Sequence, residues 1–169
     1  QQARGKRFLN LFAYTGSATV HAAIGGETSS VTVDMSNTYL DWAQRNFVLN
    51  GMCNDHKLVR ADCVQWLAEQ ANAKQRLQFD LIFLDPPTFS NSKKMDEIFD
   101  IQKDYVQLIR NAAALLAPGG NLYFSTNFRR FKMDQEALKD LVIEDISTAM
   151  IPADFARDTK IHYCWRISR

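Results

Sequence analysis

The chain has 169 residues, which is the size of one compact domain with a sizeable core, and we expect a single domain over residues 1–169. Lys and Arg total 20 against 19 Asp and Glu, 46% of residues are hydrophobic, and the net charge is +1. These values exclude a disordered chain and a uniformly basic nucleic-acid coat. Contact with RNA would therefore come from local patches or from protein outside this sequence.

The cysteines and the ends of the chain indicate a cytoplasmic protein. Cys53, Cys63 and Cys164 are widely separated, with neither the even number of a disulfide framework nor the spacing of a zinc site. No stretch approaches the ~20 apolar residues of a membrane span, and no signal peptide opens the sequence. The first residue is Gln1 and a strand-like run begins near Arg7, so we expect a piece of a longer polypeptide with upstream domains as partners. We expect no membrane or metal partner.

Strands and helices alternate along the chain. Runs of mainly apolar residues predict strands at residues 7–12, 30–34, 56–60, 79–84 and 121–126. Helical spacing and capping residues predict helices at residues 17–24, 37–50, 62–75, 98–116 and 133–141. The last two strand candidates are residues 143–150 and 161–167. This order predicts an α/β fold with a mostly parallel sheet and helices on both faces, ended by an antiparallel hairpin.

In such a sheet the ligand lies beyond the carboxyl ends of the strands. The loop 13–16 has a single glycine and lacks the glycine-rich phosphate patterns, which favours a nucleoside without phosphates. Asp34 ends the second strand and either accepts hydrogen bonds from ribose hydroxyls or caps the helix after Ser36. Asp62 either accepts from an adenine amino group or caps its own helix. Both alternatives are open at this point.

The segment Asp85-Pro86-Pro87-Thr88-Phe89 comes after a strand that reads as buried on both faces. Two prolines fix the backbone and donate no N–H, so carbonyls are left without a ladder partner. The carbonyl, the carboxylate and an aromatic ring together predict a slot for a planar base. The alternative is a rigid turn without a ligand.

These motifs, taken in order, resemble a known family. The residues that carry the resemblance are 10–16, 33–36, Asn46, 50–51, 61–62 and 85–93. They resemble class I S-adenosylmethionine-dependent RNA methyltransferases. They are most similar to the C-terminal unit of the bifunctional bacterial large-subunit rRNA guanine methyltransferases K/L, which makes 7-methylguanine in 23S rRNA. The resemblance covers about residues 6–169.

The resemblance implies a Rossmann-like class I methyltransferase fold with a mostly parallel seven-stranded sheet and S-adenosylmethionine as cofactor. The residues implied at the methionine end are Phe12, Ala13, Tyr14, Thr15 and Gly16. Asp34 would hold the ribose, Met35 and Cys63 would flank the adenine, Asp62 would accept from its amino group, and Ser36 would complete the cofactor site. The residues implied at the target base are Asp85, which also borders the cofactor, with Pro86, Pro87 and Phe89.

Guanine N7 in 23S rRNA is the favoured target, because its in-plane lone pair requires only alignment. The alternatives are the exocyclic N2 amine and cytosine C5. Cytosine chemistry needs a cysteine nucleophile, and residues 124–127 hold none. From other classes, a nicotinamide-dependent oxidoreductase would carry the glycine fingerprint that is missing, and a non-catalytic RNA-binding module would not need Asp34, Asp62 and Asp85 together.

Basic residues in two loops are the candidate RNA contacts. They are Lys93, Lys94, Arg129, Arg130 and Lys132, with Phe131 as a ring on which a base would stack. The alternative is ordinary solvated loop charge. The isolated residues His21, His56 and His162 favour neutral structural roles.

Overall fold

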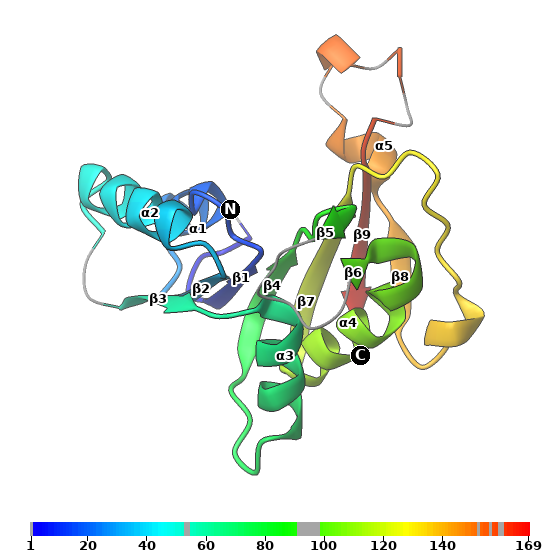
Figure 1. Cartoon of the computed structure of the whole chain (residues 1–169), viewed down its shortest axis with the longest axis horizontal. Coiled ribbons are helices and arrows are strands. Elements are labelled where there is room, and N and C mark those ends of the chain that lie inside the picture. The colour runs from blue at the N-terminus through cyan, green and yellow to red at the C-terminus, as the bar shows by residue number, and fades with distance from the viewer. Residues whose placement is uncertain (1, 53–54, 91–98, 152, 156, 159–160) are drawn as a thin grey trace.

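The computed structural model describes residues 2–52, 55–90, 99–151, 153–155, 157–158 and 161–169. In this part of the chain a sheet has the strand order β3-β2-β1-β4-β7-β9-β8 (Figure 1). Its strands are β1 (Arg7–Leu11), β2 (Ser29–Asp34), β3 (His56–Arg60), β4 (Phe79–Leu84), β7 (Leu116–Thr126), β8 (Val142–Asp145) and β9 (Tyr163–Ser168). Strands β3, β2, β1, β4 and β7 are parallel, and β9 is antiparallel to both β7 and β8. The predicted mostly parallel seven-stranded sheet with an antiparallel end is confirmed.

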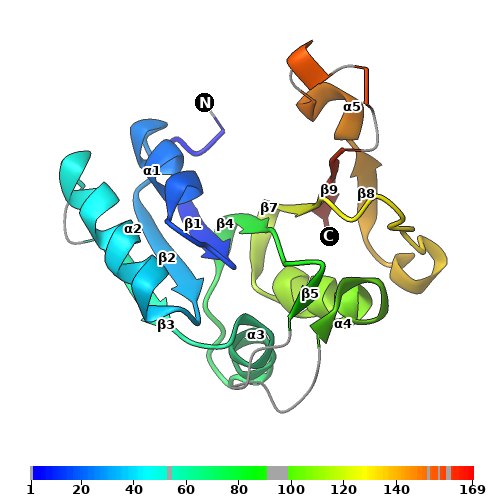
Figure 2. The same ribbon diagram turned by 45° about the horizontal axis from the view of Figure 1, so that its top comes forward.

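Helices cover both faces of the sheet (Figure 2). Helices α1 (Ser17–Ile24) and α2 (Asn37–Leu49) lie on one face, and α3 (Cys63–Asn72) and α4 (Ile101–Ala114) lie on the other. Side chains of a strand alternate between the faces, so Phe8 packs with Ala22 of α1 whereas Leu9 and Leu11 join the main core with α3 and α4. This arrangement leaves the carboxyl ends of the parallel strands as one open edge.

An aromatic cluster fills the core beneath β7 and β9. The ring of Phe131 lies 4.9 Å from Tyr105 and 5.2 Å from Trp165 between centroids, and it is only 6% exposed. The prediction that a base would stack on Phe131 is therefore wrong. Burying an apolar ring against other rings is more favourable in free energy than leaving it in water. Phe131 is therefore buried, whereas its neighbours Arg130 and Lys132 are exposed.

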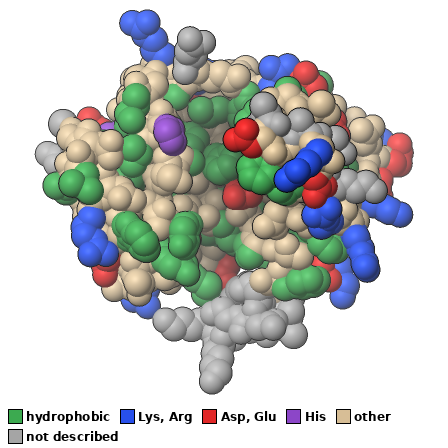
Figure 3. Space-filling view, turned by 90° about the horizontal axis from the view of Figure 1, so that it is seen from above, with side chains coloured by type: hydrophobic (Ala, Val, Ile, Leu, Met, Phe, Trp, Pro, Cys, Tyr) green, Lys and Arg blue, Asp and Glu red, His purple; other side chains and the backbone are tan. Residues whose placement is uncertain are grey.

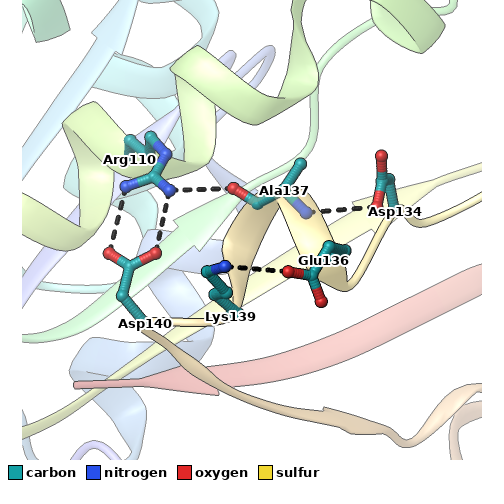
Figure 4. Close-up of polar contacts among 6 residues, drawn as sticks. All are labelled: Arg110, Asp134, Glu136, Ala137, Lys139 and Asp140. Atoms are coloured by element: carbon teal, nitrogen blue, oxygen red, sulfur yellow. Dashed lines mark hydrogen bonds and ion pairs between the residues drawn. The ribbon is translucent and has the colours of Figure 1, made fainter.

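The predicted helix over residues 133–141 is wrong in extent, because only the short turn η1 (Glu136–Leu138) forms. Side chains hold this segment instead (Figure 4). Asp134 accepts a hydrogen bond from the backbone N–H of Ala137 at 3.1 Å. Arg110 of α4 donates to both carboxylate oxygens of Asp140, at 2.8 and 3.0 Å, and to the Ala137 carbonyl at 2.8 Å. These contacts fasten the connection to α4 without a full helix.

Other boundaries also differ from the predicted ones. The predicted strand 143–150 splits into β8 and helix α5 (Ser147–Met150), because Asp145 accepts from the backbone N–H of Ser147 at 2.9 Å. Strand β7 begins at Leu116, before the predicted stop at 118–120. The loop after β4 contributes a two-strand ribbon of β5 (Phe89–Ser90) and β6 (Phe99–Asp100). A second short turn is η2 (Ala153–Phe155). Within the described residues, no helix is long and apolar enough to cross a membrane.

Candidate functional site

A cavity of about 660 Å³ opens at the carboxyl ends of the parallel strands. Seen from above, hydrophobic side chains surround a central hollow, with acidic side chains beside it (Figure 3). One side of the cavity is lined by Phe12, Tyr14, Asp34, Met35, Tyr39, Asp62 and Cys63. The other side is lined by Asp85, Pro86, Pro87, Thr88, Phe99, Asn127 and His162. Both predicted halves of the site therefore border one cavity.

The loop after β1 is held in an uncommon backbone conformation. Phe12 and Tyr14 have φ values of 56° and 51°, in the left-handed region that non-glycine residues rarely adopt. The N–H of Phe12 donates to Cys63 Sγ at 3.2 Å, and the N–H of Ala13 donates to the Val33 carbonyl at 3.1 Å. A strained backbone conformation is stable only where several contacts fix it, and residues in such conformations are found most often at ligand sites.

Helix α2 packs against this loop. Gly16 has a φ of 71°, and a Cβ there would lie 2.9 Å from the Ala43 Cβ and 3.0 Å from the Phe47 ring. The side-chain amide of Asn46 donates to the Thr15 carbonyl at 2.9 Å. Gly16 is buried and Thr15 is half-buried, and neither borders the cavity. These residues, like the buried Ala13, shape the loop that presents Phe12 and Tyr14.

Asp34 is buried at the end of β2 and borders the cavity. One carboxylate oxygen accepts from the N–H of Tyr14 at 2.9 Å, and the other accepts from the N–H of Ser36 at 2.8 Å. The Ser36 hydroxyl caps α2 by accepting from the N–H of Tyr39 at 3.3 Å. Each carboxylate oxygen has further lone-pair capacity, so Asp34 can fix the loop and still accept from a ligand.

Asp62 caps its own helix and also borders the cavity. Its Oδ1 accepts from the N–H groups of Val64 at 2.8 Å and Gln65 at 3.3 Å, which confirms the predicted helix cap. The same side chain borders the cavity. Its neighbour Cys63 is buried, and its thiol donates to the Val33 carbonyl at 3.4 Å. Burial raises the pKa of the Cys63 thiol far above its usual range, so the thiol remains protonated.

Asp85 is the carboxylate on the other side of the cavity. The Ser125 hydroxyl of β7 donates a hydrogen bond to Asp85 Oδ1. Burial raises the pKa of Asp85 above its ordinary value, while the Ser125 hydrogen bond and the charge of His162 oppose that rise. Beside it, the Thr88 hydroxyl donates to Asn127 Oδ1 at 3.2 Å. A carboxylate set in a proline-rigid wall can accept from a planar ligand without rearranging.

Several residues of this wall differ from the predicted set. Phe89 is 57% exposed and lies edge-on to Phe128, with 6.2 Å between ring centroids, whereas the ring that borders the cavity is Phe99. Sequence reasoning missed Phe99, whose place depends on the short β5 and β6 pairing. It also missed Tyr39, one turn into α2, and Asn127 and His162.

Among the basic side chains after β7, one already has an acidic partner. Arg129 donates two hydrogen bonds to Asp158, at 2.9 and 3.1 Å. Arg130 and Lys132 are exposed, and the backbone of Lys132 is held by the side chain of Gln102. The predicted contacts Lys93 and Lys94 lie outside the described residues. Within the described residues, no group of three or more His, Cys, Asp or Glu side chains is placed to hold a metal ion.

Residues 1–148 match the family described as S-adenosylmethionine-dependent methyltransferase. The chain belongs to this family. It is 59% identical over 168 residues to the ribosomal RNA large subunit methyltransferase K/L of Saccharophagus degradans, and 57% identical over 171 residues to the K/L protein of Vibrio cholerae. Each match covers 99% of this chain but only 22% and 23% of the relative, so the chain spans less than a quarter of the length of these curated relatives.

Solved structures of methyltransferases share the fold. A methyltransferase in complex with SAH is 27% identical, covers 99% of this chain and 46% of its own, and superposes with a TM-score of 0.79. A second, from Streptococcus mutans, is 26% identical, covers 99% of this chain and 45% of its own, and has a TM-score of 0.76. The predicted family, fold class and cofactor are confirmed.

The cavity of this methyltransferase fits a nucleoside cofactor. Two carboxylates, Asp34 and Asp62, can accept from hydroxyl and amino groups. The side chains of Phe12, Tyr14 and Met35 line the same cavity and add mainly apolar surface to it. Its volume is in the range of pockets that hold ligands of this size.

Proposed function

We propose that the chain transfers a methyl group from S-adenosylmethionine to a guanine of 23S rRNA, with N7 as the acceptor. The observation that carries the proposal is the pairing of two acidic walls across one cavity, Asp34 with Asp62 on one side and Asp85 on the other. The name of the K/L relatives supports large-subunit rRNA as the substrate.

On the cofactor side, Asp34 would accept from the ribose hydroxyls and Asp62 from the adenine amino group. Met35 and Cys63 would flank the adenine, and the loop that carries Phe12 and Tyr14 would border the methionine end. When bound, S-adenosylmethionine supplies an electrophilic methyl group. Because hydrogen bonds already fix Asp34 and Asp62, these acceptors need no reorganisation when the cofactor arrives.

On the base side, Pro86 and Pro87 hold the wall rigid and Asp85 faces the ring. The lone pair of guanine N7 lies in the plane of the base, so the residues of the slot need only align it and exclude water. The ring gains positive charge as the methyl group arrives. The ionised carboxylate of Asp85, held by Ser125, would stabilise that charge.

Cytosine C5 chemistry is disfavoured by the state of the two described cysteines. It requires a thiolate that attacks the ring. Cys164 is 2% exposed, and burial raises its pKa to about 11. The Cys63 thiol is likewise buried and protonated. The single glycine of the loop after β1 disfavours a nicotinamide-dependent oxidoreductase.

RNA affinity would come from exposed basic side chains and from the rest of the polypeptide. Arg130 and Lys132 are exposed in the segment after β7, and Arg129 would exchange Asp158 for a phosphate. With a net charge of +1, this chain alone offers few phosphate contacts. Upstream domains of the same polypeptide would then carry much of the binding, and a cytoplasmic site of action follows from the rRNA substrate.

The test is to identify the methylated base. Unmethylated 23S rRNA is treated with S-adenosylmethionine and the full-length protein, digested, and analysed by mass spectrometry. We expect 7-methylguanine, and we expect it to persist when Cys63 and Cys164 are replaced by Ala. A methyl group on guanine N2 would overturn the choice of N7 but keep the slot. Finding 5-methylcytosine, or a covalent adduct through a cysteine, would overturn the mechanism.

A further inference from the structure

His162 lies at the cavity because of the direction of the strand that follows it. It directly precedes β9, and β9 runs antiparallel to β7, with Tyr163 opposite Thr126 and Cys164 opposite Ser125. The start of an antiparallel strand lies at the same edge as the carboxyl ends of parallel strands. His162 therefore arrives beside the site from the last strand of the chain, far along the sequence from Asp85.

The surroundings of His162 make it a polar group available to a ligand. It borders the same cavity as Asp85, Thr88 and Asn127, and its charge acts on Asp85. Within the described part of the chain, its ring nitrogens meet no hydrogen-bond partner. Asn127 accepts from Thr88 through Oδ1, so its amide N–H groups are the competing donor at this edge of the cavity. An imidazole always carries at least one N–H donor, so the slot offers an acceptor at Asp85 and a donor at His162.

This pair of groups fits the Watson–Crick edge of guanine, the base that the proposed function places in the slot. Guanine presents N1–H and N2–H donors on its Watson–Crick edge, next to the O6 acceptor. Adenine presents an amino donor where guanine presents O6, so a donor from the protein has no partner there. We infer that His162 is a specificity-determining residue, which donates a ring N–H to O6 of the target guanine while Asp85 accepts from its donor edge. This inference rests on the proposed function and adds the group that distinguishes guanine from adenine.

The test pairs protein variants with base analogues. Short rRNA substrates carry guanine, inosine or 2-aminopurine at the methylated position, and their affinities are measured with the full-length protein saturated with S-adenosylhomocysteine. Inosine lacks the N2 amine, and 2-aminopurine lacks O6 together with the N1–H but keeps the N2 amine. We expect His162→Ala to weaken binding of the guanine and inosine RNAs about tenfold, the scale of one missing hydrogen bond, and to leave the 2-aminopurine RNA unchanged.

Three controls make the result decisive. His21→Ala removes an exposed histidine of α1 and should leave all affinities unchanged. His162→Gln keeps a donor and should restore part of the guanine affinity. Unchanged binding of S-adenosylhomocysteine establishes that His162→Ala is folded.

Two outcomes would overturn the inference. In one, His162→Ala has the same effect on guanine and 2-aminopurine RNAs. In the other, the O6-dependent loss of affinity appears with Asn127→Ala instead. If the unaltered protein fails to methylate guanine at all, the proposed function itself fails, which the methylation assay reports separately.

Discussion

Each end of the sheet holds a carboxyl group with a serine and a histidine beside it. At the carboxyl end, Asp85 accepts from Ser125 and shares an open cavity with His162. At the amino end, His56 Nδ1 lies 3.2 Å from Glu27 Oε1 and 2.9 Å from the Ser30 hydroxyl, and the Glu27 side chain is fully buried. The same residue types border an open cavity in one place and form a closed internal cluster in the other, so only the first group is accessible to a ligand.

The closed cluster at the amino end has its own electrostatic consequence. Burial raises the pKa of Glu27 to about 8, and burial lowers the pKa of His56. Neither carboxyl oxygen of Glu27 has a well-formed hydrogen bond within the described residues. We infer that Glu27 and His56 share one proton in the folded protein at neutral pH, which makes this cluster a factor in stability rather than in catalysis.

The largest expected effect concerns the open end. Replacing Asp85 with Ala should lower the rate of methyl transfer by the equivalent of about 2 to 4 kcal/mol, because a preorganised charge at the reacting ring is removed, with little change in cofactor affinity. The matched control is Asp80→Asn near the amino end of β4, the strand that Asp85 directly follows, where Asp80 pairs with Arg7 on the surface. Single-turnover rates measure both. Equal rates for Asp85→Ala and the unaltered protein would remove Asp85 from the chemistry.

The same carboxylate predicts a pH dependence. The pKa of Asp85 is raised by burial, so its ionised form is lost at a higher pH than for an ordinary aspartate. The rate of methyl transfer should therefore fall as the pH drops through this raised pKa, and a pH profile of single-turnover rates measures it. A profile that is flat through the acid range would contradict an ionised Asp85.

The next effect concerns the closed end and is a change in stability. The folded cluster keeps its shared proton up to about pH 8, whereas in the unfolded chain His56 loses its proton near pH 6.5 and Glu27 near pH 4.5. Between pH 6.5 and 8 only the folded chain holds this proton, so about 2 kcal/mol of stability is lost as pH rises through that range. Glu27→Gln should remove most of this loss in urea unfolding measured across that range. An unchanged slope in the variant would exclude the shared proton.

The smallest effect concerns the basic surface beside the open end. Replacing Arg129 and Arg130 with Ala should weaken RNA binding and lower the slope of log affinity against log salt by about 0.7 to 0.9 for each phosphate interaction that the change removes. Cofactor affinity should not change. Lys57→Ala, an exposed change at the opposite edge on β3, is the control. A slope equal to that of the unaltered protein would identify the two arginines as ordinary surface charges.

The parts of the fold that are set locally could be predicted from the sequence. Strands β3 and β4 and helix α1 have their predicted bounds, because apolar runs, caps and glycines lie within or beside each segment. The segment around Glu136 could not be predicted, since its conformation depends on Arg110 of α4. Phe131 shows the same limit, because only the packed core reveals whether an aromatic ring points inward.

The candidate site divides in the same way. Asp34 is the last residue of β2, and Asp62 and Asp85 closely follow β3 and β4, so the strand-end rule predicts all three. The structure brings them to one cavity. His162 precedes an antiparallel strand, and the sequence alone favours a structural role for it, because the rule considers only residues at the carboxyl end of a strand. The sequence does predict an antiparallel last strand. The residue that precedes such a strand lies at the same edge as the carboxyl ends of the parallel strands, and this would have indicated His162 as a site residue.

Calorimetric titration with S-adenosylhomocysteine is the sharpest test of the contrast between the two ends. We predict that the chain binds this ligand and that Asp34→Ala weakens binding by about 1.5 to 3 kcal/mol, since the ribose hydroxyls lose a charged acceptor. We also predict that Glu27→Gln, which changes a buried carboxyl at the other end of the sheet, leaves the affinity unchanged. Full affinity in Asp34→Ala, or a comparable loss in Glu27→Gln, would contradict the assignment of the carboxyl end as the cofactor site.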